Sequence, residues 1–377
     1  MDERVLAERL ITYDTSTSDG LRAAVGFVKG WLEARDVPVT GREYGGLPVV
    51  LADVGPADGP CVILHGHVDV VPAHAGQFQP RIEGDRLIGR GAYDMKGGLA
   101  AMMCAVHDIA QNGRVRVRFI CVPDEESDQL DFRCTEALVQ EGLRGDFAIT
   151  GEPTDLHIGV QAKGVLAIRV EVNGTAAHGS TPWFGDNAIL KAYDTFRRIE
   201  TLRFSRESSD LFDRPSINIA RILGGDAFNK VPDRCTMDVD IRFLPHQDPG
   251  EILADIRALG DDVQIIKTFH RAPARVSRTN PYVRALREAV SASLEDDALS
   301  VGRDGASDAI SVLEAGVPAV EFGPAGGGHH GPDEWVSIGS LGLYRRALRD
   351  FVNGLPDWLA RHAAERPALR AVDGGLL

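Results

Sequence analysis

Two histidines and an aspartate occupy alternate positions in the segment LHGHVDVVP, which spans residues 64–72. Side chains at alternate positions of a strand point to the same face, so His65, His67 and Asp69 would share one face where an apolar strand ends. Imidazole nitrogens and carboxylate oxygens are common zinc ligands. A buried structural histidine would explain any single one of these residues equally well, so the segment alone leaves both interpretations open.

Four further motifs carry residues of the same kinds. They are GRGAYDMKGG with Asp94, PDEES with Glu125 and Glu126, GEPT with Glu152, and GGHHGPDEW with His330. All but the last come at the end of a predicted strand, and in open α/β sheets ligands bind outside the carboxyl ends of the strands. Several carboxylates meeting at that edge would repel each other and could not all stay ionised without a cation.

A pair of divalent ions would resolve this repulsion. Two histidines and three carboxylates can hold two ions if one carboxylate bridges them, and a water bound there becomes a good nucleophile. Each motif also has a structural alternative: Asp94 could cap the helix that follows it, and the others could be polar turns or a glycine-rich surface loop. One shared metal site explains the presence of all five motifs better than five unrelated structural roles do.

The elements that would position these residues fall into two patterns. Residues 1–160 alternate between helices and strands, with apolar strands predicted at 47–54, 61–70 and 115–122 and a helix that ends at Gly113. This rhythm predicts an α/β layer with a mainly parallel sheet. After about residue 160 the order becomes β-β-α-β-β-α-β, which is typical of a small α+β sandwich, and from residue 274 longer helices and short buried strands return. We therefore predict one α/β domain formed by residues 1–160 and 274–377, with residues 161–273 inserted into it.

Composition excludes several classes of partner. A chain of 377 residues favours two domains. The formal net charge of −14 argues against nucleic acid and anionic membranes, which require clustered positive charge. No apolar run reaches the length of a membrane span, and the acidic N-terminus does not resemble a signal peptide. Five scattered cysteines without a CxxC motif predict neither disulfides nor a thiolate zinc site, so a cytoplasmic protein is expected.

Taken together, the motifs HGHVDVVP, GRGAYDMKGG, DEE, GEPT and HGPDEW resemble the M20 family of metallohydrolases, and the resemblance covers nearly the whole chain. The family includes succinyl-diaminopimelate desuccinylase, acetylornithine deacetylase, aminoacylase and carboxypeptidase G. The resemblance implies a zinc-hydrolase domain, an inserted lid domain that forms a homodimer, and two Zn²⁺ ions for which Co²⁺ or Mn²⁺ can substitute.

The resemblance also implies individual roles at the metal site. His67 would bind the first zinc, and Asp69 would orient it through the other ring nitrogen. Asp94 would bridge both ions and be followed by a cis peptide bond. Glu125 would be the general base that activates water and later protonates the leaving amine.

The remaining metal ligands follow from the same resemblance. Glu152 would bind the first zinc and Glu126 the second. The histidine four residues before the glutamate of PDEW would also bind the second zinc, which selects His330 over His329. The resemblance gives no role to His65 or His329.

The inserted domain contributes His178, in the segment GTAAHGSTPWFGDNAI. By resemblance this residue reaches into the partner subunit's site and stabilises the tetrahedral oxyanion, whereas the alternative is a histidine on the surface of the lid. Further candidates for substrate binding are Arg242, Asn229, Lys163 and the DGASD loop with Gly305, Ala306 and Ser307. Arg242 lies in a regular strand pattern and could equally be a solvated charge.

These residues favour hydrolysis of the amide bond of an N-acyl amino acid, in the branch of the desuccinylases and deacetylases. A carboxypeptidase or dipeptidase that cleaves short peptides would use the same chemistry with a different pocket. A non-catalytic binding homologue would have lost the base or the ligands, and all of them are present. The acyl group, the amino-acid side chain, the physiological metal and the pathway are left open by the sequence.

Overall fold

The computed structural model describes residues 2–127, 133–260 and 262–363 and divides the chain into two compact units. The first unit is formed by Met1–Ile158, Val276–Ser300 and Ser307–Leu377, and the second by Gly159–Arg275 and Val301–Ala306. The first unit stops at Ile158 and resumes at Val276, and the sequence placed these two boundaries at residues 160 and 274. Residues 301–306, which the sequence assigned to the larger domain, belong to the second unit.

The first unit is built on a mixed sheet with strand order β1-β2-β6-β3-β7-β15. Strand β3 pairs in parallel with β6 and with β7, and β7 pairs in parallel with β15. At one edge, β2 pairs antiparallel with both β1 and β6. This confirms the predicted α/β fold with a mainly parallel central sheet. The strands are β1 (Val39–Tyr44), β2 (Leu47–Val54), β3 (Cys61–His67), β6 (Arg116–Val122), β7 (Phe147–Thr150) and β15 (Ala319–Glu321).

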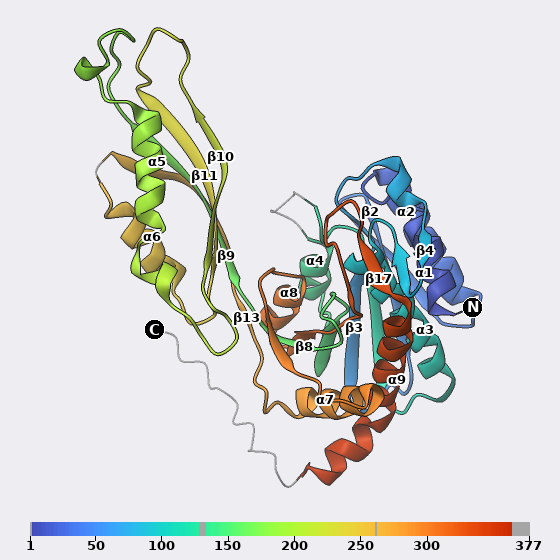
Figure 1. Ribbon diagram of the computed structural model, residues 1–377. Helices are drawn as coiled ribbons and strands as arrows, with labels where there is room; N and C mark the ends of the chain where they lie inside the picture. Colours follow the sequence, from blue (N-terminus) through green and yellow to red (C-terminus); the bar gives the residue numbers. More distant parts are fainter. Residues whose placement is uncertain (1, 128–132, 261, 364–377) are drawn as a thin grey trace. The chain divides into compact units, whose positions relative to one another are not determined.

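Helices cover both faces of this sheet (Figure 1). Helices α4 and α8 lie on one face, where a buried apolar cluster joins residues such as Ile63, Leu138 and Val312. Helices α3 and α9 lie on the other face (Figure 1). The helices of the unit are α1 (Glu3–Ile11), α2 (Ser18–Glu33), α3 (Gly97–Asn112), α4 (Cys134–Gln140), α7 (Pro281–Leu294), α8 (Ala309–Glu314) and α9 (Ile338–Arg361).

Local sequence signals set several helix starts. The side chain of Thr17 accepts a hydrogen bond from the backbone of Gly20 at the start of α2. Asn280 caps α7 in the same way, and Pro281 occupies the first helical position, where its missing N–H costs nothing. No helix in the described part of the chain is long and apolar enough to cross a membrane.

A small antiparallel sheet with the order β16-β17-β5-β4 completes the first unit. It brings the segment before Asp94 beside the segment after His330, because β17 pairs with β5. The short elements of this region are the 3₁₀ turn Ala75–Phe78, β4 (Arg81–Glu83), β5 (Arg86–Ile88), the π-helical turn Ala92–Lys96, β16 (Gly326–Gly327) and β17 (Trp335–Ser337).

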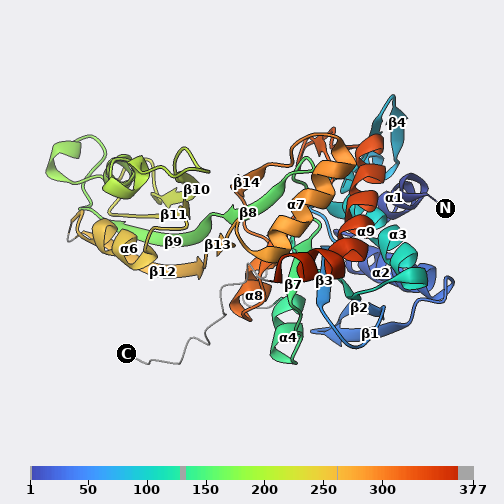
Figure 2. The same ribbon diagram turned by 90° about the horizontal axis from the view of Figure 1, so that it is seen from below.

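The second unit contains an antiparallel sheet with the order β10-β11-β9-β12, and helices α5 and α6 pack on one of its faces (Figure 2). Burial alternates residue by residue along β9 and β11, as expected for a sheet with one covered face. The elements are β8 (Ile158–Ala162), β9 (Gly164–Asn173), α5 (Ala188–Ile199), β10 (Ser216–Gly224), β11 (Arg234–Phe243), α6 (Pro249–Arg257), β12 (Val263–Arg271), β13 (Ala274–Arg275) and β14 (Ser300–Arg303), with 3₁₀ turns at Pro182–Phe184 and Arg203–Arg206.

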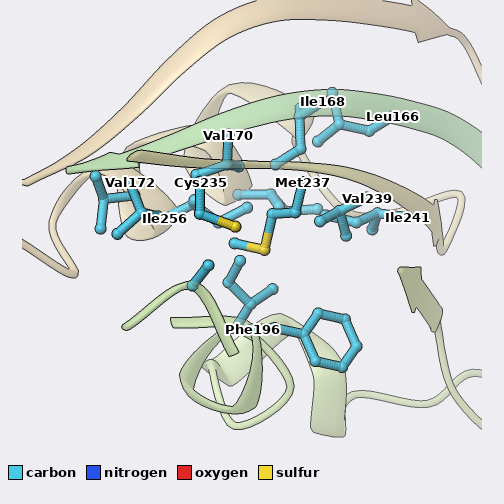
Figure 3. Close-up of a cluster of buried hydrophobic side chains, with 14 of the residues drawn as sticks. Leu166, Ile168, Val170, Val172, Phe196, Cys235, Met237, Val239, Ile241 and Ile256 are labelled. Atoms are coloured by element: carbon cyan, nitrogen blue, oxygen red, sulfur yellow. The ribbon is translucent and has the colours of Figure 1, made fainter. Parts of the chain in front are cut away.

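The core of the second unit lies between this sheet and its helices (Figure 3). Ile168 and Val170 from β9 and Met237 from β11 meet Phe196 of α5 and Ile256 of α6 there. Burying one such side chain contributes about 1.5–3 kcal/mol.

Candidate metal centre

The carboxyl ends of three neighbouring strands present the central residues of the site. His67 is the last residue of β3 and pairs in register with Val122, the last residue of β6. Because β6 and β7 run parallel to β3, the segments that follow them leave the sheet at the same edge. These segments carry Glu125 and Glu126 after β6, and Glu152 after β7.

Asp94 reaches this edge from the turn between β5 and α3. The Asp94–Met95 peptide bond is cis, as the family resemblance implied. The Sδ atom of Met95 lies 3.3 Å from the backbone nitrogen of His67, which donates to it. Gly66 leaves the necessary space, since a Cβ atom at this position would lie 2.8 Å from the Met95 methyl group. Met95 thus packs under the strand end and brings Asp94 beside His67.

One set of potential ligand atoms is formed by His67, Asp94 and Glu152, all of them buried. The Nε2 atom of His67 lies 3.2 Å from Oδ1 of Asp94 and 3.8 Å from Oε1 of Glu152. Oε1 of Glu152 is buried and has no hydrogen-bond partner among the residues that the structure describes. A buried carboxylate oxygen without a donor is expensive, and it is the kind of atom that a metal ion satisfies.

A second set contains Asp94 again, together with Glu126, His329 and His330. The Nε2 atom of His330 lies 2.7 Å from Oε1 of Glu126 and 3.4 Å from Oδ2 of Asp94. The Nε2 atom of His329 lies 2.6 Å from the same Asp94 oxygen. Within each set, the potential ligand atoms lie within 4.8 Å of one another. Asp94 therefore offers one oxygen to each side.

The charges at this edge suit a divalent cation. Burial raises the pKa values of Glu125 and Glu152 well above the usual range for glutamate, and the neighbouring carboxylate of Asp94 adds to the shift. A positive ion near these groups would favour their ionised forms. With nitrogen and oxygen ligands and no sulfur, both sets fit zinc or a similar divalent metal.

Asp69 connects the end of β3, which carries His67, with the segment that carries Glu125 and Glu126. Its Oδ1 and Oδ2 atoms accept hydrogen bonds from the backbone nitrogens of Glu125 at 3.1 Å and Glu126 at 2.7 Å. The Nδ1 atom of His67 lies 3.1 Å from the backbone oxygen of Asp69 and 3.4 Å from its Oδ1 atom. Asp69 can therefore fix the His67 ring, as the resemblance implied, and also the loop that carries the expected base.

His65 lies away from both sets, although it neighbours His67 along the strand face. Its Nε2 atom lies 2.9 Å from the hydroxyl oxygen of Thr135, and that hydroxyl donates to Asp308 at 2.5 Å. Since the hydroxyl uses its own hydrogen on Asp308, the bond from His65 needs a proton on Nε2. Burial lowers the pKa of His65 to about 4, so the ring is neutral near pH 7. His65 therefore joins β3 to α4 and to the start of α8.

His178 and Asn229 lie together in the second unit. The backbone oxygen of Asn229 accepts a hydrogen bond from Gly179, and His178 forms a β-bridge with Lys230. The His178 ring is exposed, and its Nδ1 atom accepts from the backbone nitrogen of Ser180 at 3.2 Å. A neutral ring that accepts at Nδ1 carries its proton on Nε2. This nitrogen is then free to donate to an oxyanion.

Arg242 and Lys163 have ionic partners in the second unit. Arg242 lies on the polar face of β11, where its Nε atom is 3.0 Å from Oδ2 of Asp240. The amino group of the buried Lys163 lies 2.7 Å from the exposed carboxylate of Asp304. The sequence could not reveal either partner.

The DGASD loop separates into an open part and a buried part. Gly305 is exposed, and open space surrounds the position that a side chain would take. Ser307 is buried instead, donates its hydroxyl to Oε1 of Glu321 at 2.6 Å, and accepts from the backbone of Ala309 at the start of α8. The hydrogen bonds of Ser307 thus serve the fold of the first unit.

Two features of the site were not found from the sequence. The Nε2 atom of His329 lies closer to Asp94 than that of His330 does, and the pair of histidines in GGHHG was the only signal in the sequence. Glu334 is almost fully buried and accepts hydrogen bonds from the segment that carries Asp94. The sequence gives Glu334 no role beyond marking the position of His330.

The chain is similar to known proteins over most of its length. Residues 63–354 match Peptidase family M20/M25/M40. A protein named succinyl-diaminopimelate desuccinylase from Leptothrix cholodnii is 30% identical, with 92% of this chain and 96% of the relative covered. A protein named acetylornithine deacetylase from Yersinia pseudotuberculosis is 29% identical, with 70% and 71% covered. The crystal structure of an M20 family metallo-carboxypeptidase from Sulfolobus solfataricus shares the fold with a TM-score of 0.78 at 19% identity, covering 95% of this chain and 100% of that one.

Proposed function

The chain belongs to peptidase family M20/M25/M40, and from this premise we propose that it hydrolyses the amide bond of an N-acyl amino acid in a metal-dependent reaction. The observation that carries the proposal is the buried carboxylate of Asp94, which lies between two sets of potential ligands. The names of the relatives, succinyl-diaminopimelate desuccinylase and acetylornithine deacetylase, support this substrate class.

We propose two Zn²⁺ ions, with Co²⁺ or Mn²⁺ as possible substitutes. His67, Asp94 and Glu152 would hold one ion, and Asp94, Glu126 and His330 the other, which agrees with the two sets of potential ligand atoms. When bound, the ions would polarise the amide carbonyl and acidify a water molecule. The geometry of Asp69 supports its role in holding His67 and the backbone of Glu125 and Glu126 in place.

Glu125 would then act as the general base and acid. It would take a proton from the attacking water and pass it to the leaving nitrogen, so that the products are a carboxylate and a free amino acid. The N–H on Nε2 of His178 would donate to the oxyanion that forms during attack. Arg242, Asn229, Lys163 and Gly305 are the candidates for contacts to the rest of the substrate.

We also propose that the protein is a homodimer through the second unit, with His178 supplied to the partner subunit's site. Large apolar side chains are exposed on this unit around the turn Pro182–Phe184, helix α5 and strand β10. They are Trp183, Phe184, Leu190, Tyr193, Ile222, Leu223 and Phe228. Strand β10 is also an edge of its sheet, and such an edge is a ready surface for pairing with a second chain. The five free thiols favour a reducing, cytoplasmic setting.

Amine release from a panel of substrates tests the proposed function. The zinc-loaded protein would be incubated with N-succinyl-LL-diaminopimelate, N-acetylornithine, other N-acetyl amino acids and several dipeptides, beside the Glu125→Gln variant. We expect release from an acyl amino acid, with kcat reduced about 10²–10⁴-fold in the variant because it has lost its base. Cleavage of the dipeptides alone would contradict the proposed substrate class, and zinc binding without any turnover would contradict the assignment as an enzyme.

A further inference from the structure

Glu334 binds the backbone of the segment that carries Asp94. Its carboxylate is 1% exposed and accepts four hydrogen bonds. Oε1 accepts from the backbone nitrogens of Tyr93 and Asp94, each at 3.0 Å. Oε2 accepts from the backbone nitrogen of Gly91 at 3.0 Å and from a guanidinium nitrogen of Arg90 at 2.7 Å. Both oxygens are thus fully used within the protein.

The backbone around Gly91 is shaped for this contact. Gly91 has a φ of 79°, and a Cβ atom there would lie 2.7 Å from Val70 and 2.8 Å from Lys96. Only glycine adopts this conformation without strain and fits the space. The turn directs the backbone N–H groups of Gly91, Tyr93 and Asp94 toward one carboxylate, as in the backbone anion sites called nests. Here the anion is a side chain of the protein itself.

Arg90 extends the connection to a second expected ligand. Its side chain is 4% exposed, and its second guanidinium nitrogen donates to the backbone oxygen of His330 at 3.0 Å. His330 has a φ of 57°, which a residue other than glycine adopts only when neighbouring contacts support it. The Arg90–Glu334 ion pair therefore holds the backbone of Asp94 at one end and the backbone of His330 at the other.

We propose that the Arg90–Glu334 ion pair positions Asp94 and His330 so that their side chains are spaced for a metal ion before it binds. The inference rests on the proposed function, in which Asp94 and His330 share one ion. Neither member of the pair would touch the metal, so both are positioning residues. A buried ion pair adds little net stability compared with apolar residues, which makes a contribution to geometry a better reason for its presence.

The first test is the Glu334→Gln variant, measured by calorimetric titration of the metal-free protein with Zn²⁺. The amide offers one acceptor in place of a carboxylate and turns an N–H₂ group toward the donors of Arg90 and the Asp94 turn. Zinc affinity should fall about 10–100-fold, as it commonly does when a residue that supports a metal ligand is changed. The visible absorption spectrum of the Co²⁺-loaded protein should also change, because the ligands around the ion are displaced.

Two further variants separate positioning from a loss of stability. Asp108→Asn breaks another ion pair of the first unit, in which Arg345 lies 2.7 Å from Asp108, and should lower stability without changing zinc affinity. The double variant Arg90→Met/Glu334→Gln removes both charges and should regain stability relative to Glu334→Gln, because no unpaired charge stays buried. Its zinc affinity should stay low, because the turn and His330 have lost their partners.

The results of these measurements separate a failure of the positioning role from a failure of the proposed function. Wild-type zinc affinity in Glu334→Gln, or recovery of zinc affinity together with stability in the double variant, would overturn the positioning role while leaving the proposed function intact. Failure of the wild-type protein itself to bind zinc would reject the proposed function and this inference with it. If Glu334→Gln does not fold, the double variant alone decides, since its affinity either stays low or returns.

Discussion

The Oδ2 atom of Asp69 lies 2.7 Å from the backbone nitrogen of Glu126, and its Oδ1 atom lies 3.1 Å from that of Glu125. A single carboxylate after β3 therefore holds the segment after β6, which carries both the expected base and an expected ligand. The same residue lies against the Nδ1 atom of His67. Asp69 links residues from two strand ends, and its removal should affect chemistry as well as metal binding.

The Asp69→Ala variant tests this link. Loss of both backbone contacts should let Glu125 and Glu126 shift, so we expect kcat to fall about 10–100-fold at saturating zinc. Asp53→Ala is a matched control, because Asp53 is a half-exposed carboxylate that pairs with Arg116 and Arg118. Steady-state kinetics on the best acyl amino acid would measure both variants, and an unchanged kcat for Asp69→Ala would contradict the expected role.

The two adjacent histidines should differ in their effect on metal binding. His330 forms ion pairs with both Glu126 and Asp94, whereas the ion pair of His329 is with Asp94. We therefore expect His330→Ala to weaken binding of one of the two zinc ions by about tenfold or more, and His329→Ala to have a smaller effect. Calorimetric titration and metal analysis after dialysis would measure this, and the opposite order would assign the ligand to His329.

His65 should matter for stability but not for metal content. In His65→Ala, Thr135 loses a buried hydrogen-bond partner and a cavity forms, so we expect unfolding to become easier by about 2–4 kcal/mol. Denaturant unfolding of the metal-loaded protein would give this difference. The number of bound zinc ions should be the same as in the wild type, and loss of an ion would mean that His65 takes part in metal binding.

The dimer proposal can be tested with charges on the exposed apolar surface. Leu190→Glu combined with Leu223→Glu should shift sedimentation from dimer to monomer, because each places a charge on a surface that dimerisation would bury. Ile266→Glu is the control, since Ile266 is a half-exposed residue of β12 at the opposite edge of the same sheet.

Mixed dimers test whether His178 acts in the partner subunit's site. Glu125→Gln and His178→Ala proteins, each nearly inactive alone, would be mixed and allowed to exchange subunits. A mixed dimer contains one site with both residues intact, so activity should return to part of the wild-type level. Absence of any recovery after demonstrated exchange would mean that His178 acts within its own subunit or not at all.

The sequence predicted most of the fold because hydrophobic periodicity and strand order are local signals. The alternation along β9 and β11 and the apolar runs of β3 and β6 were readable directly. The convergence of His67 and Glu152 could also be predicted, since parallel strands bring their carboxyl ends to one edge, whereas Asp94 reaches this edge from the turn after β5.

Features that depend on three-dimensional loop conformation could not be predicted in this way. Glu334 becomes important only because the turn at Gly91 directs backbone N–H groups toward it. Arg242 has the same strand pattern whether it binds a substrate or pairs with Asp240, as it does here. Ser307 and Glu321 are distant in sequence, and no local signal indicated that they are bonded to each other.

A crystal of the zinc-loaded protein, measured at the zinc absorption edge, tests the shared role of Asp94 most directly. Two anomalous peaks are expected, one among His67, Asp94 and Glu152 and the other among Asp94, Glu126 and His330. A single peak that Asp94 does not contact, or no peak in zinc-saturated crystals, would contradict a metal centre built on this carboxylate.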